Sequence, residues 1–388
     1  MREELTLIDL FCGCGGFTAG LLFPEGYGRV GWRVLLGVDI NATAVETFAA
    51  NFGKQAARQV NLVEADPWSY LSELGLRPGE LDHLHASPPC EAYSVNNRIN
   101  GNHADLRFRV ALEWAEVFLP KVVTIENVRN LEKAHDAEIR NRLNSAGYRV
   151  ISFKIDAADY GVPQHRKRLF YLACLATLGI APRAPAATHC DPSKPQQKLR
   201  PWVTVREAIG DLPPRKAGEG PDQFVSDIDP TDPADQLYLS EYASMMRPPK
   251  GAVITGHYAR LLNELAVKRL RYLGPGQAIW DLPSHLRPKM GFRGAYGRMH
   301  PDYPAKTITT GLRGPSHGQF CHYAQDRLIT LREAARLQSF PDTFSFAGGR
   351  SAQAFQIGNA VPPLLSRAIR RVSEELILQA KSKSLVSV

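Results

Sequence analysis

Short apolar runs alternate with longer amphipathic segments through the first half of the chain, and this alternation limits the folds open to it. The runs cover residues 5–11, 34–40, 82–87, 121–128, 148–156 and 168–175. A helical pattern over residues 42–51 follows the second run. Strands that alternate with helices form a mostly parallel sheet with helices packed on its faces. We therefore predict an α/β fold built on a Rossmann-like sheet.

The middle of the chain has a different character. Prolines are frequent and regular periods are few between Ala181 and about Asp235, and regular patterns return from Arg327. Near the end, apolar residues recur at spacings of three and four, which gives one apolar helix face: Leu365, Ile369, Val372 and Leu376. We predict a first domain at 1–180, a smaller irregular domain at 181–324, and a segment at 325–388 that returns to the first domain.

Positive charge is concentrated in the second half of the chain. The net charge is +8, and between Arg247 and Arg313 there are twelve lysines and arginines against three acids. A basic block beside a nearly neutral remainder is typical of a surface that binds a polyanion. A basic face that is only solvated remains the alternative.

The composition is that of an ordinary water-soluble protein, with 44% hydrophobic and 22% charged residues. We find no signal peptide and no run of about 18 apolar residues, so we expect a cytoplasmic protein without membrane segments. Six cysteines, with Cys12 and Cys14 only one residue apart, do not resemble a disulfide framework. Two His/Cys pairs, 189–190 and 321–322, lack zinc-finger spacing, and we predict no metal.

A glycine-rich turn follows the first apolar run, in the segment from Asp9 to Phe17. Glycines here permit a sharp turn and let a ligand approach bare backbone, at the strand end where α/β sheets bind nucleotide-like ligands. The turn departs from the dinucleotide pattern G-x-G-x-x-G, because Thr18 occupies the last glycine position. Asp39 ends the second run, where a carboxylate can accept ribose hydroxyls. A tight turn without a ligand is the alternative.

Polar residues that carry chemistry stand beside other strands of the same sheet. Two prolines precede Cys90, Glu126 interrupts an apolar strand, and Arg166 and Arg168 alternate ahead of another strand. A lone cysteine is more often an inert buried residue, but a carboxylate within an apolar strand is costly without partners. A thiol, a carboxylate and an arginine pair form a plausible site for activating a polar heterocycle.

These segments give the chain a specific resemblance. It resembles the cytosine-5 DNA methyltransferase family, whose ordered motifs appear as DLFCGCGGFTAGL, GVDINATAVETF, SPPCEAYS, ENV, QHRKR, YPAKTITTG with RLITLREAARLQSFPD, and QIGNAVPP. The resemblance runs nearly from one end to the other. It implies a methyltransferase α/β domain with a small target-recognition domain, S-adenosylmethionine as cofactor and duplex DNA as substrate.

The resemblance also implies residue roles. At the cofactor, Phe11 would stack on adenine, Asp39 would hold the ribose and Asp66 the adenine amino group. The methionine part would lie on the amides of Gly13, Cys14, Gly15 and Gly16, and Ile40, Pro89 and Asn359 would complete the cofactor site. In catalysis, Cys90 would be the nucleophile, Glu126 would bind the cytosine, and Arg166 and Arg168 would steady its O2 atom.

The sequence departs from the family pattern after Cys90. Glu91 stands where the family usually has Gln, beside DNA phosphate, and Tyr93 stands where it usually has Phe. An acid near phosphate could weaken closure of this loop on DNA. The polar residues that follow, Asn96, Asn97, Arg98 and Asn100, suit a flap that closes on DNA, with a merely solvated loop as the alternative.

The chemistry requires a covalent step, because carbon 5 of cytosine is a poor nucleophile. Addition of a thiolate to carbon 6 makes carbon 5 nucleophilic, and Glu126 and the arginines would stabilise charge at N3 and O2. The target base must first leave the duplex stack. No residue of the sequence identifies the base that removes the carbon 5 proton.

Three other functions fit the sequence less well. A transfer-RNA methyltransferase with the same motifs is disfavoured because the Cys-Phe-Thr hallmark is absent from the second domain. A catalytically silent DNA-binding protein is disfavoured by the intact set of Cys90, Glu126 and arginines, and a nicotinamide oxidoreductase by the broken glycine pattern. We expect a monomer, with a cognate restriction endonuclease or defence system as possible partner.

Overall fold

The structure is a computed structural model that describes residues 4–23, 31–89, 107–288 and 294–386. The chain forms two compact units. Unit 1 comprises residues 1–156, 167–186 and 366–388, and unit 2 comprises residues 157–166 and 187–365. Among the described residues, no helix combines the length and apolar composition needed to cross a membrane.

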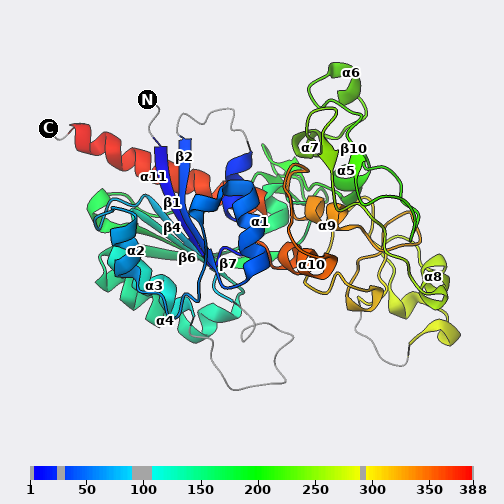
Figure 1. Cartoon of the computed structure of the whole chain (residues 1–388), viewed down its shortest axis with the longest axis horizontal. Helices are drawn as coiled ribbons and strands as arrows, with labels where there is room; N and C mark the ends of the chain where they lie inside the picture. Colours follow the sequence, from blue (N-terminus) through cyan, green and yellow to red (C-terminus); the bar gives the residue numbers. More distant parts are fainter. Residues whose placement is uncertain (1–3, 24–30, 90–106, 289–293, 387–388) are drawn as a thin grey trace. The chain divides into compact units, whose positions relative to one another are not determined.

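Unit 1 is built on a seven-stranded sheet with the order β3-β2-β1-β4-β5-β7-β6 (Figure 1). The first five of these strands pair in parallel, and β7 runs antiparallel to both β5 and β6. The predicted mostly parallel α/β sheet is confirmed. The strand bounds are β1 Glu4–Leu10, β2 Gly31–Asp39, β3 Ala57–Gln59, β4 His83–Ala86, β5 Val122–Asn127, β6 Tyr148–Asp156 and β7 Lys167–Leu175.

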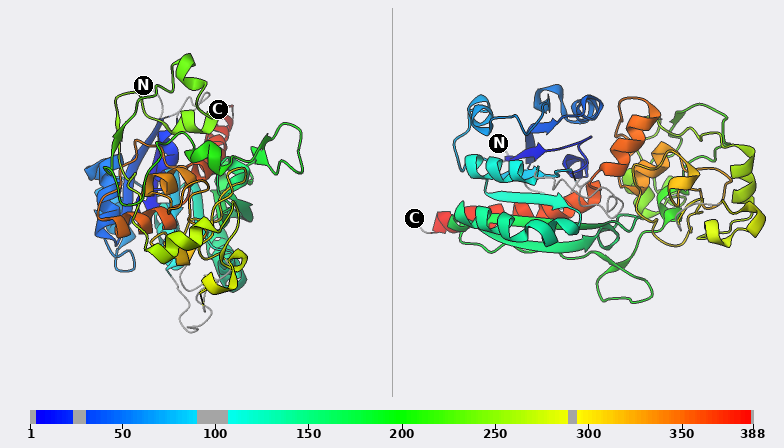
Figure 2. Two further views of the ribbon diagram at one scale, coloured as in Figure 1. Left: turned by 90° about the vertical axis from the view of Figure 1, so that its right-hand side faces the viewer. Right: turned by 90° about the horizontal axis from the view of Figure 1, so that it is seen from below.

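Helices cover both faces of this sheet (Figure 2). Successive residues of β7 point to opposite faces of the sheet. Tyr171 packs in the hydrophobic cluster that includes residues of α3 and α4, whereas Leu172 packs with Val372 and Leu376 of α11. The alternation follows from the two-residue period of a strand. The helices of unit 1 are η1 Thr18–Leu22, α1 Ala42–Phe52, η2 Lys54–Ala56, α2 Pro67–Glu73, α3 Phe108–Phe118, α4 Asn130–Ser145, η6 Ala176–Leu178 and nearly all of α11, Pro363–Val386.

Unit 2 contains short elements joined by long irregular segments. Its strands are β8 His189–Cys190, β9 Arg200–Pro201, β10 Phe224–Val225 and β11 Val253–Ile254. Its α-helices are α5 Val205–Ile209, α6 Pro233–Gln236, α7 Glu241–Met246, α8 Glu264–Arg271, α9 Leu331–Leu337 and α10 Arg350–Asn359. Its 3-10 turns are η5 Ala157–Tyr160, η7 Ile279–Asp281, η8 Ser284–Leu286 and η9 Pro315–His317.

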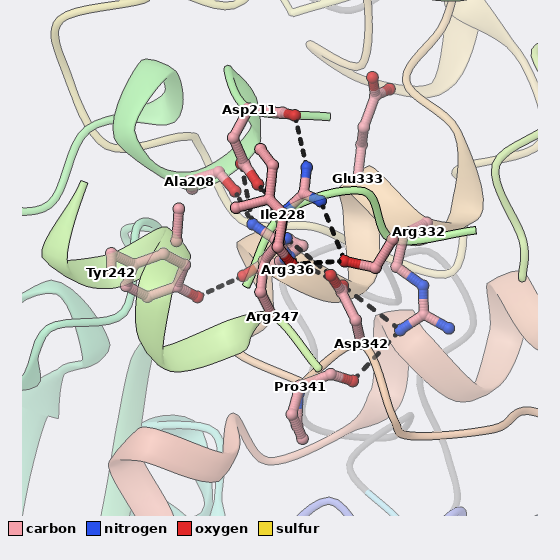
Figure 3. Close-up of polar contacts among 12 residues, drawn as sticks. Ala208, Asp211, Ile228, Tyr242, Arg247, Arg332, Glu333, Arg336, Pro341 and Asp342 are labelled. Carbon is pink, nitrogen blue, oxygen red and sulfur yellow. Dashed lines mark hydrogen bonds and ion pairs between the residues drawn. The ribbon is translucent and has the colours of Figure 1, made fainter. Parts of the chain in front are cut away.

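Buried ion pairs hold unit 2 together where regular backbone pairing is sparse. Arg336 is fully buried between Asp211, at 3.0 Å, and Asp342, at 2.6 Å (Figure 3). Arg247 also contacts Asp211, with its Nε 2.7 Å from the carboxylate. Burial raises the pKa of Asp211, but the two guanidinium groups outweigh burial and lower it overall. The Asp211 carboxylate therefore stays ionised at neutral pH.

Residues 325–365, assigned from the sequence to the returning segment, lie in unit 2. The guanidinium of Arg336 in α9 donates to Ala208 O at 3.0 Å, and that of Arg332 donates to Thr255 O at 2.9 Å. The first bond joins residues 128 apart in the sequence, and the second joins residues 77 apart. Contacts between residues so far apart leave no trace in the local periodicity of the sequence. For this reason the predicted start of the returning segment, residue 325, differs from the end of unit 2, residue 365.

Candidate active site

The carboxyl ends of the parallel strands bring most of the predicted site residues of unit 1 to one edge of the sheet. Leu10, the last residue of β1, is in register with Val38 of β2 and with Ala86 of β4. Ala86 is in turn in register with Ile125 of β5. Because β7 runs antiparallel to β5, its first residues lie at this same edge. The order of the strands reverses at β1, which is where open α/β sheets bind their ligands.

The glycine-rich loop needs its glycines for two different reasons. Gly13 and Gly15 both have positive φ angles, 52° and 85°, and Phe11 also lies at a positive φ of 54°. A Cβ atom on Gly15 would lie 2.5 Å from the ring of Phe52, so close packing excludes a side chain there. A Cβ on Gly13 would meet no atom within 4 Å. Gly13 is therefore required by conformation and Gly15 by both conformation and space.

Asp39 and the loop are bonded to each other. Its Oδ2 accepts from Gly13 N and its Oδ1 from Asn41 N, both at 2.9 Å. The Gly15 amide donates to Cys12 O at 2.8 Å. Two of the four amides expected to cradle the methionine part are thus used inside the loop. Burial raises the pKa of Asp39, which is half-buried.

Exposed apolar side chains stand within two residues of Asp39 and of Asp66 in the sequence. Ile40 is 63% exposed and Trp68 is 59% exposed, so both offer apolar surface. Asp66 is exposed and caps α2, where it accepts from Trp68 N and Ser69 N. Carboxylates next to open apolar side chains suit the ribose hydroxyls and the adenine ring of S-adenosylmethionine. Asp39 and Asp66 remain predictions as cofactor ligands.

Two further predicted cofactor residues come from other segments of the chain. Pro89 is half-buried and is the last described residue before a gap. Asn359 is the exposed last residue of α10 and belongs to unit 2. Both remain predictions as cofactor ligands.

Glu126 and Arg168 form an ion pair at the edge of the sheet where β5 ends and β7 begins. The Oε1 atom of Glu126 lies 2.8 Å from Nε of Arg168, and only 8% of Glu126 is exposed. The next residue, Asn127, donates from its side chain to Pro88 O at 3.0 Å and accepts from Val128 N at 2.8 Å. Asn127 therefore ties the end of β5 to the segment that leads to Cys90. The ENV motif contained this residue, but the sequence assigned it no role.

Arg166 has surroundings different from those of Arg168. It is 2% exposed and donates to Ile308 O at 2.9 Å and to Gly358 O at 3.0 Å, all within unit 2. A Cβ atom on Gly358 would lie 2.4 Å from the backbone of Thr309, so the two acceptor segments are tightly packed. The QHRKR, TITTG and QIGN motifs thus meet around Arg166. The alternation of the two arginines in sequence does not give them equivalent partners.

Cys90 lies outside the described residues, as do Glu91, Tyr93 and the predicted flap residues Asn96, Asn97, Arg98 and Asn100. The described cysteines are all buried and unbridged. Burial raises the pKa of Cys14, Cys174 and Cys321 to about 12, and that of Cys12 well above its usual range. These four thiols are therefore poor nucleophiles at neutral pH. Among the described residues, no group of three or more His, Cys, Asp or Glu side chains could hold a metal ion.

Comparison with known proteins identifies the family. Residues 5–375 match the sequence profile of the C-5 cytosine-specific DNA methylase family. The chain belongs to this family. Among its relatives, the type II methyltransferase M1.HphI of Haemophilus parahaemolyticus is 31% identical over 374 residues, which cover 94% of this chain and 86% of that protein. The type II methyltransferase M.AgeI of Thalassovita gelatinovora is 28% identical over 433 residues, which cover 93% of this chain and 97% of that protein.

Solved structures agree with this fold. A DNA modification methyltransferase encoded within an Escherichia coli prophage superposes with a TM-score of 0.70 at 24% identity, over 96% of this chain and 99% of that one. A methyltransferase of Entamoeba histolytica superposes with a TM-score of 0.58 at 15% identity, over 96% of this chain and 99% of that one. The predicted family and fold are confirmed, and the protein is a DNA (cytosine-5-)-methyltransferase.

Proposed function

We propose that this methyltransferase moves a methyl group from S-adenosylmethionine to carbon 5 of a flipped cytosine in duplex DNA, through a covalent bond between Cys90 Sγ and carbon 6. The observation that carries the proposal is the Glu126–Arg168 pair at 2.8 Å, beside the segment that leads to Cys90. The hydrogen bond from Asn127 to Pro88 O links that segment to the strand that carries Glu126.

The cofactor would be held by the residues after β1, β2 and β3. Phe11 and Ile40 would pack on the adenine, Asp39 would accept the ribose hydroxyls, and Asp66 would accept from the adenine amino group. The glycine-rich turn of Gly13, Cys14, Gly15 and Gly16 would lie against the methionine part. S-adenosylmethionine supplies an electrophilic methyl group at this site. Phe11 is half-buried and Asp66 exposed, so both are open to a ligand.

Ring activation is the work of the catalytic residues. Attack of the Cys90 thiolate on carbon 6 moves electron density to carbon 5 and N3. Glu126 supplies a proton at N3 and accepts from the exocyclic amine, while Arg168 stays beside it and donates to O2. Arg166, held by two carbonyl groups, acts as a support for these motifs. After transfer a base removes the carbon 5 proton, the Cys90–carbon 6 bond breaks to release the thiolate, and the proton on N3 returns to Glu126.

The biological setting is part of the same proposal. We place the enzyme in a bacterial restriction-modification or defence system, acting as a monomer in the cytoplasm, where its DNA substrate lies. Two similar proteins carry the name type II methyltransferase, which supports this setting. A cognate endonuclease would cut the same sequence when it is unmethylated.

Bisulfite sequencing of DNA from cells that express the chain tests the proposal. We expect protected cytosines in one recurring sequence, and no protection in cells that express Cys90→Ala. Absence of protection in the wild type would reject the activity on DNA. Protection that persists with Cys90→Ala would reject the nucleophile.

A further inference from the structure

Two histidines and a threonine form a buried polar row beneath the proposed site. His83 and His85 of β4 and Thr124 of β5 are all 0% exposed. The Thr124 hydroxyl lies 2.9 Å from Nε2 of His83 and 2.8 Å from Nδ1 of His85. The row ends at Ser87, whose hydroxyl lies 2.8 Å from Nε2 of His85. Polar groups are costly in a sheet interior, so a purely apolar row would be the cheaper way to pack it.

The row lies on the face of the sheet that also carries Glu126. Residues two apart in a strand point the same way, so Thr124 shares its face with Glu126, and His85 shares its face with Ser87. The residues between them, Leu84 and Ile125, pack in the core on the opposite face. The polar row therefore runs along the sheet toward the edge where Glu126 and Arg168 lie.

His85 also contacts the glycine-rich loop. The ring of Phe17, which ends that loop, stacks on His85 with centroids 3.4 Å apart and planes 3° from parallel. His85 thus touches three segments at once: the cofactor loop through Phe17, the strand of Glu126 through Thr124, and the segment three residues before Cys90 through Ser87.

The hydrogen bonds of the row favour one order of protons. Burial lowers the pKa of His83 to about 3 and that of His85 well below its usual range, so both rings are neutral. Nδ1 of His83 is buried and has no partner among the described residues. A bare acceptor is tolerated better than a bare N–H donor, so the His83 proton sits on Nε2. Each group then donates to the next, and His85 donates to Ser87.

We propose that His85 is a positioning residue for methyl transfer, which fixes the cofactor loop, the Glu126 strand and the segment before Cys90 relative to one another. The inference rests on the proposed function. Because His85 Nε2 donates to the Ser87 hydroxyl oxygen, the Ser87 hydroxyl can donate its own proton to a group outside the row. Loss of the row would leave the fold in place but loosen the geometry on which transfer depends.

Matched substitutions separate positioning from packing. Thr124→Val has the same shape and removes the hydroxyl, Thr124→Ser keeps the hydroxyl, and Ser87→Ala removes only the end of the row. We expect Thr124→Val and Ser87→Ala to lower the single-turnover rate about 10- to 100-fold, the scale of small misplacements at an active site. Thr124→Ser should stay within about threefold of wild type. Cofactor dissociation constants should change by less than about threefold in all three.

The measurement is single-turnover transfer of a labelled methyl group to target duplex, with cofactor affinity and melting temperature taken on the same preparations. Folded Thr124→Val and Ser87→Ala proteins that transfer at the wild-type rate would overturn the role of His85. If Thr124→Val does not fold, Ser87→Ala decides alone, because Ser87 is only half-buried at the end of the row. A wild type that transfers no methyl group would instead reject the proposed function.

Discussion

Glu126 Oε1 and Arg168 Nε lie 2.8 Å apart at the edge of the sheet where β5 ends and β7 begins. The pair is partly buried, with 11% of the Glu126 side chain and 15% of the Arg168 side chain exposed. Such a pair serves either as scaffold or as a preformed site for the polar edge of a cytosine. The two roles predict different consequences when the charge of Glu126 is removed.

Glu126→Gln should slow methyl transfer by roughly 10² to 10⁴ while cofactor binding survives, because glutamine keeps the shape but cannot supply the proton at N3. Single-turnover methylation and cofactor affinity, measured on the same protein, check this. If the pair were only scaffold, the uncompensated Arg168 would cost on the order of 3 to 5 kcal/mol of stability. A strongly destabilised variant with a near-normal rate would contradict the catalytic role.

Asp39→Asn should weaken cofactor binding. The carboxylate accepts from both Gly13 N and Asn41 N, and an amide offers only one acceptor oxygen, so one of these bonds is lost. The same carboxylate is proposed to accept a ribose hydroxyl. A hydrogen bond to a charged group contributes about 1.5 to 3 kcal/mol, so its loss to the ribose corresponds to roughly 10- to 150-fold in dissociation constant. Calorimetric titration with S-adenosylmethionine measures this. Unchanged affinity would remove Asp39 from the cofactor site.

The arginines and lysine at the end of α8 should not act alike on DNA. Lys268 and Arg271 are exposed, whereas Arg269 donates to Leu286 O and to the Tyr296 hydroxyl, both at 2.8 Å. Replacing Lys268 and Arg271 with Gln should lower the salt dependence of DNA binding by about 0.9 for each phosphate that the protein no longer neutralises. Arg269→Gln should instead destabilise the protein by about 1 to 3 kcal/mol. An unchanged salt slope in the double variant would place these residues away from DNA.

Acid should weaken unit 2 through Glu333. Burial raises the pKa of this carboxyl, but the hydrogen bonds and charge of Arg327 outweigh burial and hold it at about 2. Because the folded pKa lies below the ordinary value of 4.5, the pair stabilises fully above about pH 4.5 and loses its effect as the pH falls toward 2. Denaturant unfolding across this range should show a smaller acid loss in Glu333→Gln than in wild type. Equal losses would contradict this assignment.

The sequence predicted the sheet of unit 1 well because its signals are local. The run at 148–156 coincides with β6, and the run at 121–128 exceeds β5, Val122–Asn127, by one residue at each end. Apolar, β-branched strands bounded by turns carry these signals themselves. Within unit 1, the segments that follow β1, β2, β4 and β5 and the start of β7 therefore lie at one edge of the sheet.

The interactions that the sequence missed depend on tertiary packing. Arg166 and Arg168 look equivalent in QHRKR, yet one donates to two carbonyl groups of unit 2 and the other pairs with Glu126. Much of the basic block likewise has structural partners: Arg298 is buried and donates to four backbone carbonyls. Where regular elements are few, arginine side chains satisfy loop carbonyls, and charge counted along the sequence overstates the surface available to DNA.

The covalent role of Cys90 is the central claim, and a duplex that carries 5-fluorocytosine at the target position tests it most directly. Fluorine at carbon 5 blocks the final elimination, so the adduct between enzyme and DNA should accumulate. Peptide mapping after incubation with S-adenosylmethionine should place the DNA on Cys90, and only when the cofactor is present. An adduct on Cys12 or Cys14, or turnover of normal duplex with no adduct on the fluorinated one, would contradict the account.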